Sequence, residues 1–508
     1  MDASVHLALS LVSHTNVGKT TLARTLLGRD IGEVRDAPHV TEFADVHTML
    51  ETPEGDVLQL WDTPGFGDSV RLIRRLRQAS NPIGWFMSEV WDRWRDRPFW
   101  AAQQVVKNIR DEADVLLYLV SAAEAPEAAG YVAPEMELLA WTGKPVIVLL
   151  NQLGAPGAAT LAADLAQWTR HLAALAPQAR VLSFDAFARC WVQEVGLLDA
   201  IAAALVDPAR QAAMDRLIDA WRRERLATFD ASMAVLAESL ARIASAHEIV
   251  AAPDGLGARL RSLGAALKAS AGGTRTDATA QAQQRLTERL AAEMRDSTSA
   301  LIRLHRLEGE SDAKVLEAVQ VDLHQRVEPG WAAIWGGAVS GALAGLSADV
   351  LSGGLTLGGG LLGGGVLGAL GAAGLAHGVN RVRGTDRSWL AWKAEALMPM
   401  VDAALLRYLA VAHFGRGRGA WTDASAPGGW AVAVDAALAP HRETLASLWR
   451  DRVPPGAESR SETMRPELEA MLRSAAREVL QRLYPEALRA FASGAGVSGH
   501  EAEPRIGS

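Results

Sequence analysis

The 508-residue sequence predicts a mostly parallel α/β domain, with helices on both faces of its sheet, followed by an all-α region. Three observations lead to this prediction. Over residues 1–205, apolar runs alternate with helical stretches, which is the pattern of parallel strands joined by crossover helices. Most of the remaining sequence is rich in Ala, Leu and Arg at helical spacing. Residues 330–379 depart from that pattern, because their glycine and apolar residues predict an apolar helical hairpin.

The strands of the first domain are expected at the apolar runs, residues 5–12, 57–61, 115–120, 145–150 and 181–184. Residues 43–61 also predict a hairpin that turns at Thr52-Pro53-Glu54-Gly55-Asp56. Helices are expected within 207–250, 277–326, 389–412, 430–450 and 464–492, with a loop over 251–276 and a disordered tail beyond Ser493. The expected domains are an α/β domain (1–205), a helical stalk or bundle (206–329), the apolar hairpin (330–379) and a C-terminal helical region (380–508).

Composition limits the classes of function. The net charge of −8 gives no electrostatic case for nucleic acid as a partner. A single cysteine, Cys190, excludes an internal disulfide framework and suits a reducing compartment. The N-terminus lacks the basic and apolar regions of a signal peptide, so we expect this end in the cytosol.

A phosphate-binding loop follows the first strand. Residues Ser13-His14-Thr15-Asn16-Val17-Gly18-Lys19-Thr20 lie between an apolar run and a helical stretch. In such a loop, backbone N–H groups and a helix N-terminus hold phosphates, the lysine reaches the β- and γ-oxygens, and the threonine holds Mg²⁺. The predicted nucleotide-binding residues here are Ser13, Asn16, Val17, Gly18, Lys19, Thr20 and Thr21. Ser13 replaces the first glycine of the pattern, and we expect this replacement to weaken the affinity for nucleotide at most.

A second motif, Asp62-Thr63-Pro64-Gly65, follows the strand at 57–61. In a P-loop protein this Asp holds Mg²⁺, usually through water, and the Gly N–H contacts the γ-phosphate. Thr41, between the two motifs, is the expected switch I ligand for Mg²⁺, with Thr48 as the alternative. Lys19, Thr41 and Gly65 are therefore the predicted catalytic residues, and Thr20, Thr41 and Asp62 the predicted Mg²⁺ ligands. The two motifs together predict a P-loop nucleotidase.

These motifs resemble the Era/TrmE-like, translation-factor-class bacterial GTPases. The resemblance is greatest to a bacterial group in which a G domain precedes a long C-terminal domain of unknown function, and its motifs cover about residues 5–190. It implies hydrolysis of GTP to GDP and phosphate with low intrinsic turnover, because Phe66 stands where Ras-like proteins have a glutamine. It also implies a K⁺ site at Asn16, or activation by a nucleotide-dependent dimer or a protein partner. The alternative for Asn16 is that asparagine simply suits a loop with positive φ.

The base-recognition motif is degenerate. Asn151-Gln152-Leu153-Gly154 stands where Asn-Lys-x-Asp is expected, so the carboxylate that pairs with guanine is missing. Asp185, after the next strand, is a candidate substitute or an ordinary turn residue. Asn151 and Asp185 are the predicted base-binding residues, and an ATPase or relaxed-specificity NTPase stays open beside a GTPase.

An insertion over 69–112 is rich in arginine and tryptophan. Three interpretations remain open: a helix that packs its tryptophans on another domain, a membrane-surface helix, and a nucleic-acid surface. Because the insertion adjoins the second motif, it is also a candidate transmitter of nucleotide state.

The segment from Trp331 to Ala376 contains one charged residue, Asp349, and glycines at every fourth position in two runs. This glycine-zipper-like pattern favours insertion into a membrane, with a buried soluble hairpin and a linker as alternatives. Flanking arginines would then place the nucleotide domain at the cytoplasmic face of the inner cell membrane. The sequence thus predicts a membrane-associated GTP-binding protein, and the alternative from another class is a pore-like effector gated by nucleotide.

Overall fold

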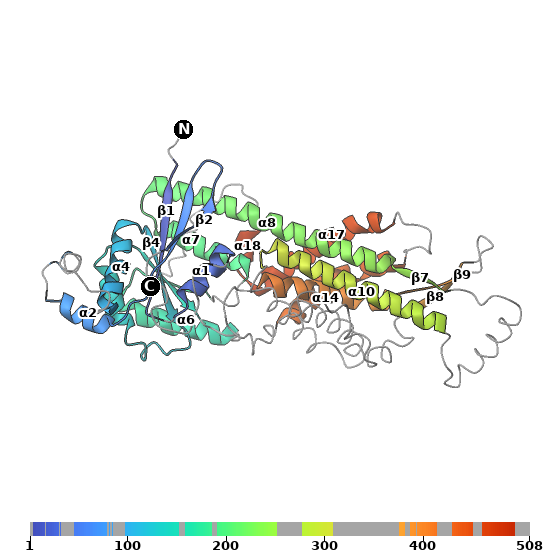
Figure 1. Cartoon of the computed structure of the whole chain (residues 1–508), viewed down its shortest axis with the longest axis horizontal. Helices are drawn as coiled ribbons and strands as arrows, with labels where there is room; N and C mark the ends of the chain where they lie inside the picture. The colour runs from blue at the N-terminus through green and yellow to red at the C-terminus, as the bar shows by residue number, and fades with distance from the viewer. Residues whose placement is uncertain are drawn as a thin grey trace, which may run out of the picture.

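The computed structural model describes residues 4–15, 17–29, 31, 45–78, 81, 84, 97–151, 158–184, 190–250, 277–307, 375–380, 387–392, 394–413, 429–450 and 460–492. The described chain is elongated, with an α/β domain at one end and long helices that run away from it (Figure 1).

The α/β domain is built on a six-stranded sheet with the order β2-β3-β1-β4-β5-β6. Its strands are β1 (His6–Ser13), β2 (Asp45–Glu51), β3 (Val57–Asp62), β4 (Val115–Ser121), β5 (Val146–Asn151) and β6 (Arg180–Ser183). β2 pairs antiparallel with β3, and all other pairs are parallel. The predicted strands and the predicted hairpin are therefore confirmed.

Helices cover both faces of this sheet, as predicted. On one face, α1 (Lys19–Leu27) and α7 (Glu194–Ala204) pack against side chains such as Leu9 and Leu117. The other face carries α2 (Ser69–Leu76), α4 (Arg97–Asp111), α5 (Val132–Ala140) and α6 (Ala158–Ala173). Val12 and Leu116 belong to this second core, because successive side chains of a strand point to opposite faces.

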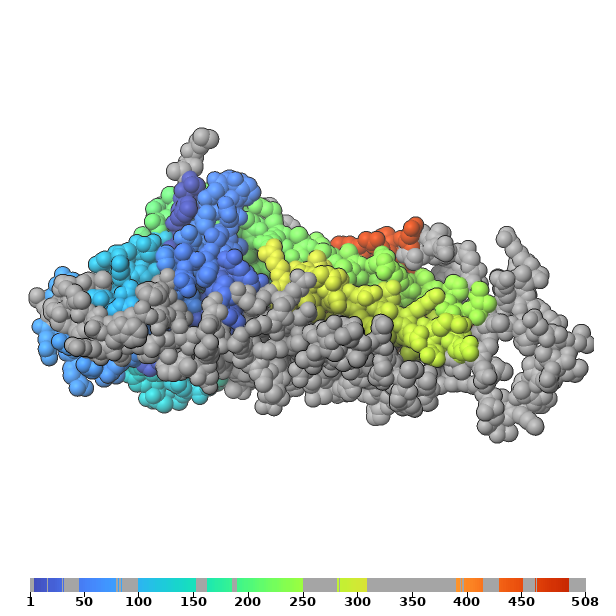
Figure 2. All heavy atoms as spheres, in the orientation of Figure 1, coloured from blue at the N-terminus to red at the C-terminus, as the bar shows by residue number. Residues whose placement is uncertain are grey.

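Helices form most of the described region after the α/β domain. They are α8 (Pro208–Ser245), α10 (Asp277–Leu304), α14 (Ala394–Ala412), α15 (Trp430–Leu438), α16 (Arg442–Arg450), α17 (Arg460–Leu483) and α18 (Ala487–Ala490). α8 begins where Asp207 accepts a hydrogen bond from the Ala209 N–H and Pro208 occupies the first turn. α10 lies along α8, and the two helices are in contact over the face seen in Figure 2.

A small antiparallel sheet at the far end of the helices corrects part of the prediction. It has the order β7-β9-β8 and consists of β7 (His247–Val250), β8 (Leu375–Asn380) and β9 (Arg387–Trp392). Residues 247–250 and 389–392 were expected to be helical, and 375–379 were expected to end the hairpin. Their extended conformation depends on partners that are distant in the sequence, such as Ala391 opposite His247.

Residues 331–374, which carry the predicted glycine zipper, lie outside the described residues. In the part of the chain that the structure does describe, no helix has both the length and the apolar character that a membrane span requires.

The α/β domain and the helices share one hydrophobic core. Trp191, in the 3₁₀ turn Trp191–Gln193 before α7, donates a hydrogen bond of 3.1 Å to the Tyr408 hydroxyl on α14. Its ring also contacts Trp221 and Phe229 on α8 and Phe491 after α18. This aromatic junction joins three helices of the second region to the α/β domain.

Candidate nucleotide-binding site

The candidate site lies where the strands β1 and β3 end, at the N-terminus of α1. Gly18 adopts a φ of 96°, a left-handed conformation that favours glycine, directly before α1. The Asn151 side-chain amide, at the end of β5, donates a hydrogen bond of 2.8 Å to the Val17 carbonyl. A Cβ atom on Gly18 would lie only 2.8 Å from the same amide nitrogen. Gly18 and Asn151 therefore fix the loop close to the sheet.

Lys19 is almost completely buried in the loop. Its ammonium group donates to the Ser13 hydroxyl at 3.0 Å and lies 3.5 Å from the His14 carbonyl oxygen. Burial lowers the pKa of Lys19 to about 8, although the carboxylates of Asp62 and Glu135 act in the opposite direction. Ser13 thus supplies a hydroxyl group for Lys19 that glycine, the usual residue of the pattern, could not.

Thr20 and Asp62 meet at the first turn of α1. The Thr20 hydroxyl donates to Asp62 Oδ2 at 2.6 Å. Asp62 is 3% exposed, and within the described residues its other oxygen, Oδ1, has no hydrogen-bond partner. Burial raises the pKa of Asp62 to about 6, against the effects of Thr20 and Lys19. A buried carboxylate oxygen without a partner beside a hydroxyl group fits Mg²⁺, which prefers oxygen ligands.

The second loop packs directly on the first. The Phe66 N–H donates to the Ser13 carbonyl at 2.9 Å, and the Thr15 N–H donates to the Phe66 carbonyl at 3.2 Å. A Cβ atom on Gly65 would lie 2.9 Å from Thr15 Cα, so only glycine permits this approach. The Phe66 side chain is fully buried in the core beneath α2 and offers no polar group to the site.

A polar cluster beside the loop was missed by the sequence analysis, which gave His14 no partner. His14 Nδ1 lies 2.8 Å from Glu135 Oε1, and its ring stacks on Tyr131 at 4.5 Å. The Tyr118 hydroxyl donates to the other Glu135 oxygen at 2.7 Å. Burial raises the pKa of Glu135, while hydrogen bonds from His14 and Tyr118 oppose the shift. Two features of the sequence could have indicated this cluster: a tyrosine in an otherwise aliphatic strand, and a glutamate among the apolar residues of α5.

Several predicted site residues cannot be placed. Asn16, Thr41, Asp185 and residues 152–154 lie outside the described residues, so their roles stay predictions. Thr48, the alternative to Thr41, lies inside β2.

The described parts of the insertion over 69–112 include α2 and α4, which pack on the sheet. Between them the guanidinium of Arg71 lies over the Phe99 ring, 4.8 Å from its centre. Residues 85–96, which contain three of its tryptophans, lie outside the described residues.

The strand order, the phosphate loop and the Asp62 loop together define the G domain of a P-loop GTPase. Residues 170–482, more than half of the chain, match the family model described as a domain of unknown function, DUF3482, so the chain belongs to this family. Residues 8–152 match the model described as a 50S ribosome-binding GTPase. The two matches together cover both regions of the molecule.

Individual relatives resemble the G domain alone. GTPase Der of Myxococcus xanthus is 31% identical over 147 residues, which is 28% of this chain and 26% of Der. GTPase Era of Carboxydothermus hydrogenoformans is 27% identical over 149 residues, 28% of this chain and 39% of Era. The chain therefore spans less than half the length of these curated relatives. A crystal structure of an Aquifex aeolicus Era variant bound to GDP and AlF₄⁻ is 20% identical, with a TM-score of 0.29, over 40% of this chain and 58% of Era.

Proposed function

We propose that this protein binds GTP together with Mg²⁺ and hydrolyses it slowly to GDP and phosphate. The observation that supports this most directly is the 2.6 Å hydrogen bond between Thr20 and Asp62, next to the unpaired Asp62 Oδ1. Backbone N–H groups of the loop would hold the phosphates, and Lys19 would exchange the Ser13 hydroxyl for phosphate oxygens. Thr20, Asp62 and Thr41 would hold Mg²⁺, which neutralises charge on the phosphates when it is bound. The Gly65 N–H would contact the γ-phosphate.

Hydrolysis by the purified full-length chain tests this function. We expect Lys19→Ala to lower the rate about a hundredfold or more, because it removes a preorganised charge from the phosphate site. Lys107→Ala, which removes an exposed lysine from α4, is the matched control and should retain the wild-type rate. Equal rates for the wild type and Lys19→Ala would refute the proposal.

The choice of base is part of the same proposal. Relatives of the G domain support guanine, whereas Gly154 lacks the carboxylate that rejects adenine. Titration calorimetry with GDP and with ADP separates the two, and we expect tighter binding of GDP. Tighter binding of ADP would identify an ATPase or a relaxed-specificity NTPase instead.

K⁺ is the proposed activator. The support is the sequence position of Asn16 together with Phe66, whose buried ring cannot orient water. A bound K⁺ would offset transition-state charge in the way an arginine finger does. We expect faster hydrolysis in K⁺ than in Na⁺ at equal ionic strength, and Asn16→Ala should remove the difference. A dimer that forms only with bound GTP, or a protein partner, is the alternative route to activation.

Membrane association through residues 331–376, at the cytoplasmic face of the cell membrane, is a separate proposal. Its support is the single charge in this segment and the arginines that flank it. In flotation with anionic vesicles we expect the full chain to float and a variant lacking 331–374 to remain at the bottom. Vesicle leakage on nucleotide binding, without any hydrolysis, would favour the pore-like effector.

A further inference from the structure

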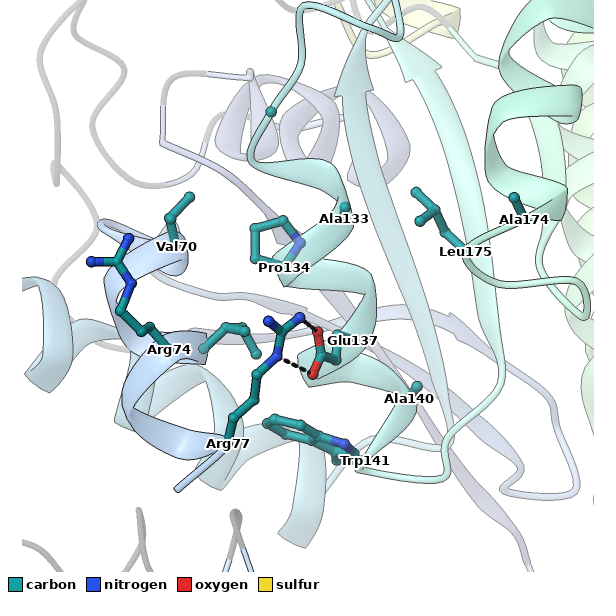
Figure 3. Close-up of a pocket in the computed structure, with 12 residues that line it drawn as sticks. Val70, Arg74, Arg77, Ala133, Pro134, Glu137, Ala140, Trp141, Ala174 and Leu175 are labelled. Carbon is teal, nitrogen blue, oxygen red and sulfur yellow. Dashed lines mark hydrogen bonds and ion pairs between the residues drawn. The ribbon is translucent and has the colours of Figure 1, made fainter. Parts of the chain in front are cut away.

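A pocket of about 590 Å³ opens between α2 and α5, beside the end of α6 (Figure 3). Val70, Arg74 and Arg77 reach it from α2, whereas Glu137 reaches it from α5. Its volume is within the range of pockets that bind ligands or partner side chains. None of the phosphate-loop residues lines it, so this pocket is distinct from the nucleotide site.

Most of the pocket wall is apolar. Pro134 and Trp141, from α5 and just after it, and Leu175, after α6, are among the residues that line it (Figure 3). Val70 is 49% exposed, whereas the other apolar residues of α2, which are Leu72, Ile73 and Leu76, are buried. An apolar side chain that covers such a surface removes apolar area from water, which stabilises the complex.

The charge of the pocket is positive. Its lining contains two arginines and one carboxylate, Glu137. Arg77 binds that carboxylate through two hydrogen bonds, one of them 2.9 Å from Nε to Oε1, so this pair is neutral. Arg74 is exposed and has no ion pair within the described part of the chain. α2 itself carries no acidic residue. The unpaired positive charge therefore belongs to Arg74, at the edge of an apolar pocket.

Both walls of the pocket connect to the nucleotide loops. α2 starts soon after Gly65, and Asp68 caps it by accepting a hydrogen bond of 2.9 Å from the Arg71 N–H. On α5, Glu137 faces the pocket while Glu135 binds His14 of the phosphate loop. Each of the two loops is thus joined directly to a helix that forms a wall of the pocket.

We propose that this pocket binds an acidic, apolar segment of a protein partner, and that the affinity depends on the bound nucleotide. A carboxylate of the segment pairs with Arg74, and a bulky apolar side chain nearby fills the space against Val70 and Trp141. This complementarity of charge and shape gives specificity as well as affinity. The nucleotide dependence rests on the proposed GTPase function, whereas the binding of the segment does not.

A library of random short peptides displayed on phage tests the proposal, with the full-length chain as bait. Selected peptides are synthesised, and their Kd is measured by fluorescence anisotropy with the chain in GDP and in a non-hydrolysable GTP analogue. We expect the selected peptides to combine Asp or Glu with a bulky apolar residue, and their Kd to differ between the two nucleotides. Arg74→Glu should weaken binding about tenfold or more, and Ala133→Trp, which fills the pocket, should also weaken it.

Arg75→Glu is the matched control, because it makes the same charge change on the same helix outside the pocket lining. It should change the Kd by no more than about twofold. Selected peptides without acidic residues, or equal binding by Arg74→Glu, would overturn the proposal. So would Arg74-dependent binding to anionic vesicles without peptide binding, since that would identify a membrane surface. Arg74-dependent peptide binding by a chain that binds no nucleotide would leave the pocket assignment standing and refute only the GTPase function.

Discussion

Glu135 is a buried carboxylate that contacts the phosphate loop through His14. It is fully buried, and its two oxygens contact His14 and Tyr118. A buried carboxylate needs such partners, because an oxygen left without a hydrogen bond has lost its interaction with water. His14 therefore contributes to the conformation of the phosphate loop through its contact with Glu135.

A double-mutant cycle tests this arrangement. His14→Ala leaves Glu135 Oε1 without its partner and should lower the free energy of unfolding by about 1–3 kcal/mol. Glu135→Gln removes the negative charge, so adding it to His14→Ala should cost less than the sum of the single changes. Urea unfolding of the four proteins measures the coupling, which we expect to be about 1 kcal/mol or more. Additive effects would show that the two side chains do not stabilise each other.

At the scale of the elements, the β2–β3 hairpin is joined to α8 by one ion pair. Asp56, in the hairpin turn, accepts hydrogen bonds of 2.6 and 3.1 Å from Arg216 on α8 and one of 3.0 Å from the Val5 N–H. Asp56 is 1% exposed, so the pair is shielded from solvent on the carboxylate side. Because the hairpin directly precedes the Asp62 loop, this contact is a direct link between the G domain and the long helices.

The ion pair makes stability depend on pH. The hydrogen bond from Arg216 holds the pKa of Asp56 below its usual value of 3.8. The contribution of the ion pair to the free energy of unfolding is therefore complete above pH 3.8, and it is lost as the pH falls through the lower pKa of Asp56 in the folded state. Asp56→Asn should lower the free energy of unfolding by about 1–3 kcal/mol at neutral pH. This difference from the wild type should shrink as the pH falls below 3.8.

Urea unfolding of both proteins at neutral and acidic pH measures this difference. Asp219→Asn is the control, because Asp219 pairs with Arg222 while 53% of its side chain is exposed. That substitution should cost about 0.5 kcal/mol or less at any pH. A difference between Asp56→Asn and the wild type that does not change with pH would contradict the argument.

The elements also show what the sequence could predict. β4 and β5 are continuous apolar runs, as strands buried on both faces must be, so their positions were predictable. β7 could not be predicted, because a strand of 4 residues directly after a long helix gains its conformation from β9, more than a hundred positions later. In the site, Lys19 and Asp62 were predictable from motifs whose spacing follows from the backbone. Glu135 was not, because it reaches His14 from a position 121 residues away.

At the scale of the whole molecule, one core extends from the sheet to the C-terminal helices. Leu9 of β1 and Val479 of α17 belong to the same cluster of buried side chains. The aromatic junction around Trp191 and an ion pair between Asp199 on α7 and Arg489 on α18, at 2.9 Å, lie along this path. Because this core is continuous, we expect the G domain and the helices to open as one cooperative unit.

Nucleotide should therefore stabilise helices that it does not touch. A ligand that binds only the folded state stabilises it by about 2.7 kcal/mol at a hundred times its Kd, which slows global opening about a hundredfold. With GDP and Mg²⁺ present, hydrogen exchange should slow in α17, around Leu472 and Val479, as well as in α1, because both exchange through the same opening. Mass spectrometry of the exchanged peptides measures this, and Lys19→Ala, which should not bind nucleotide, is the control. Protection confined to the α/β domain would mean that the shared core does not couple the two regions, and that nucleotide state reaches the helices by local contacts such as Asp56 and Arg216 alone.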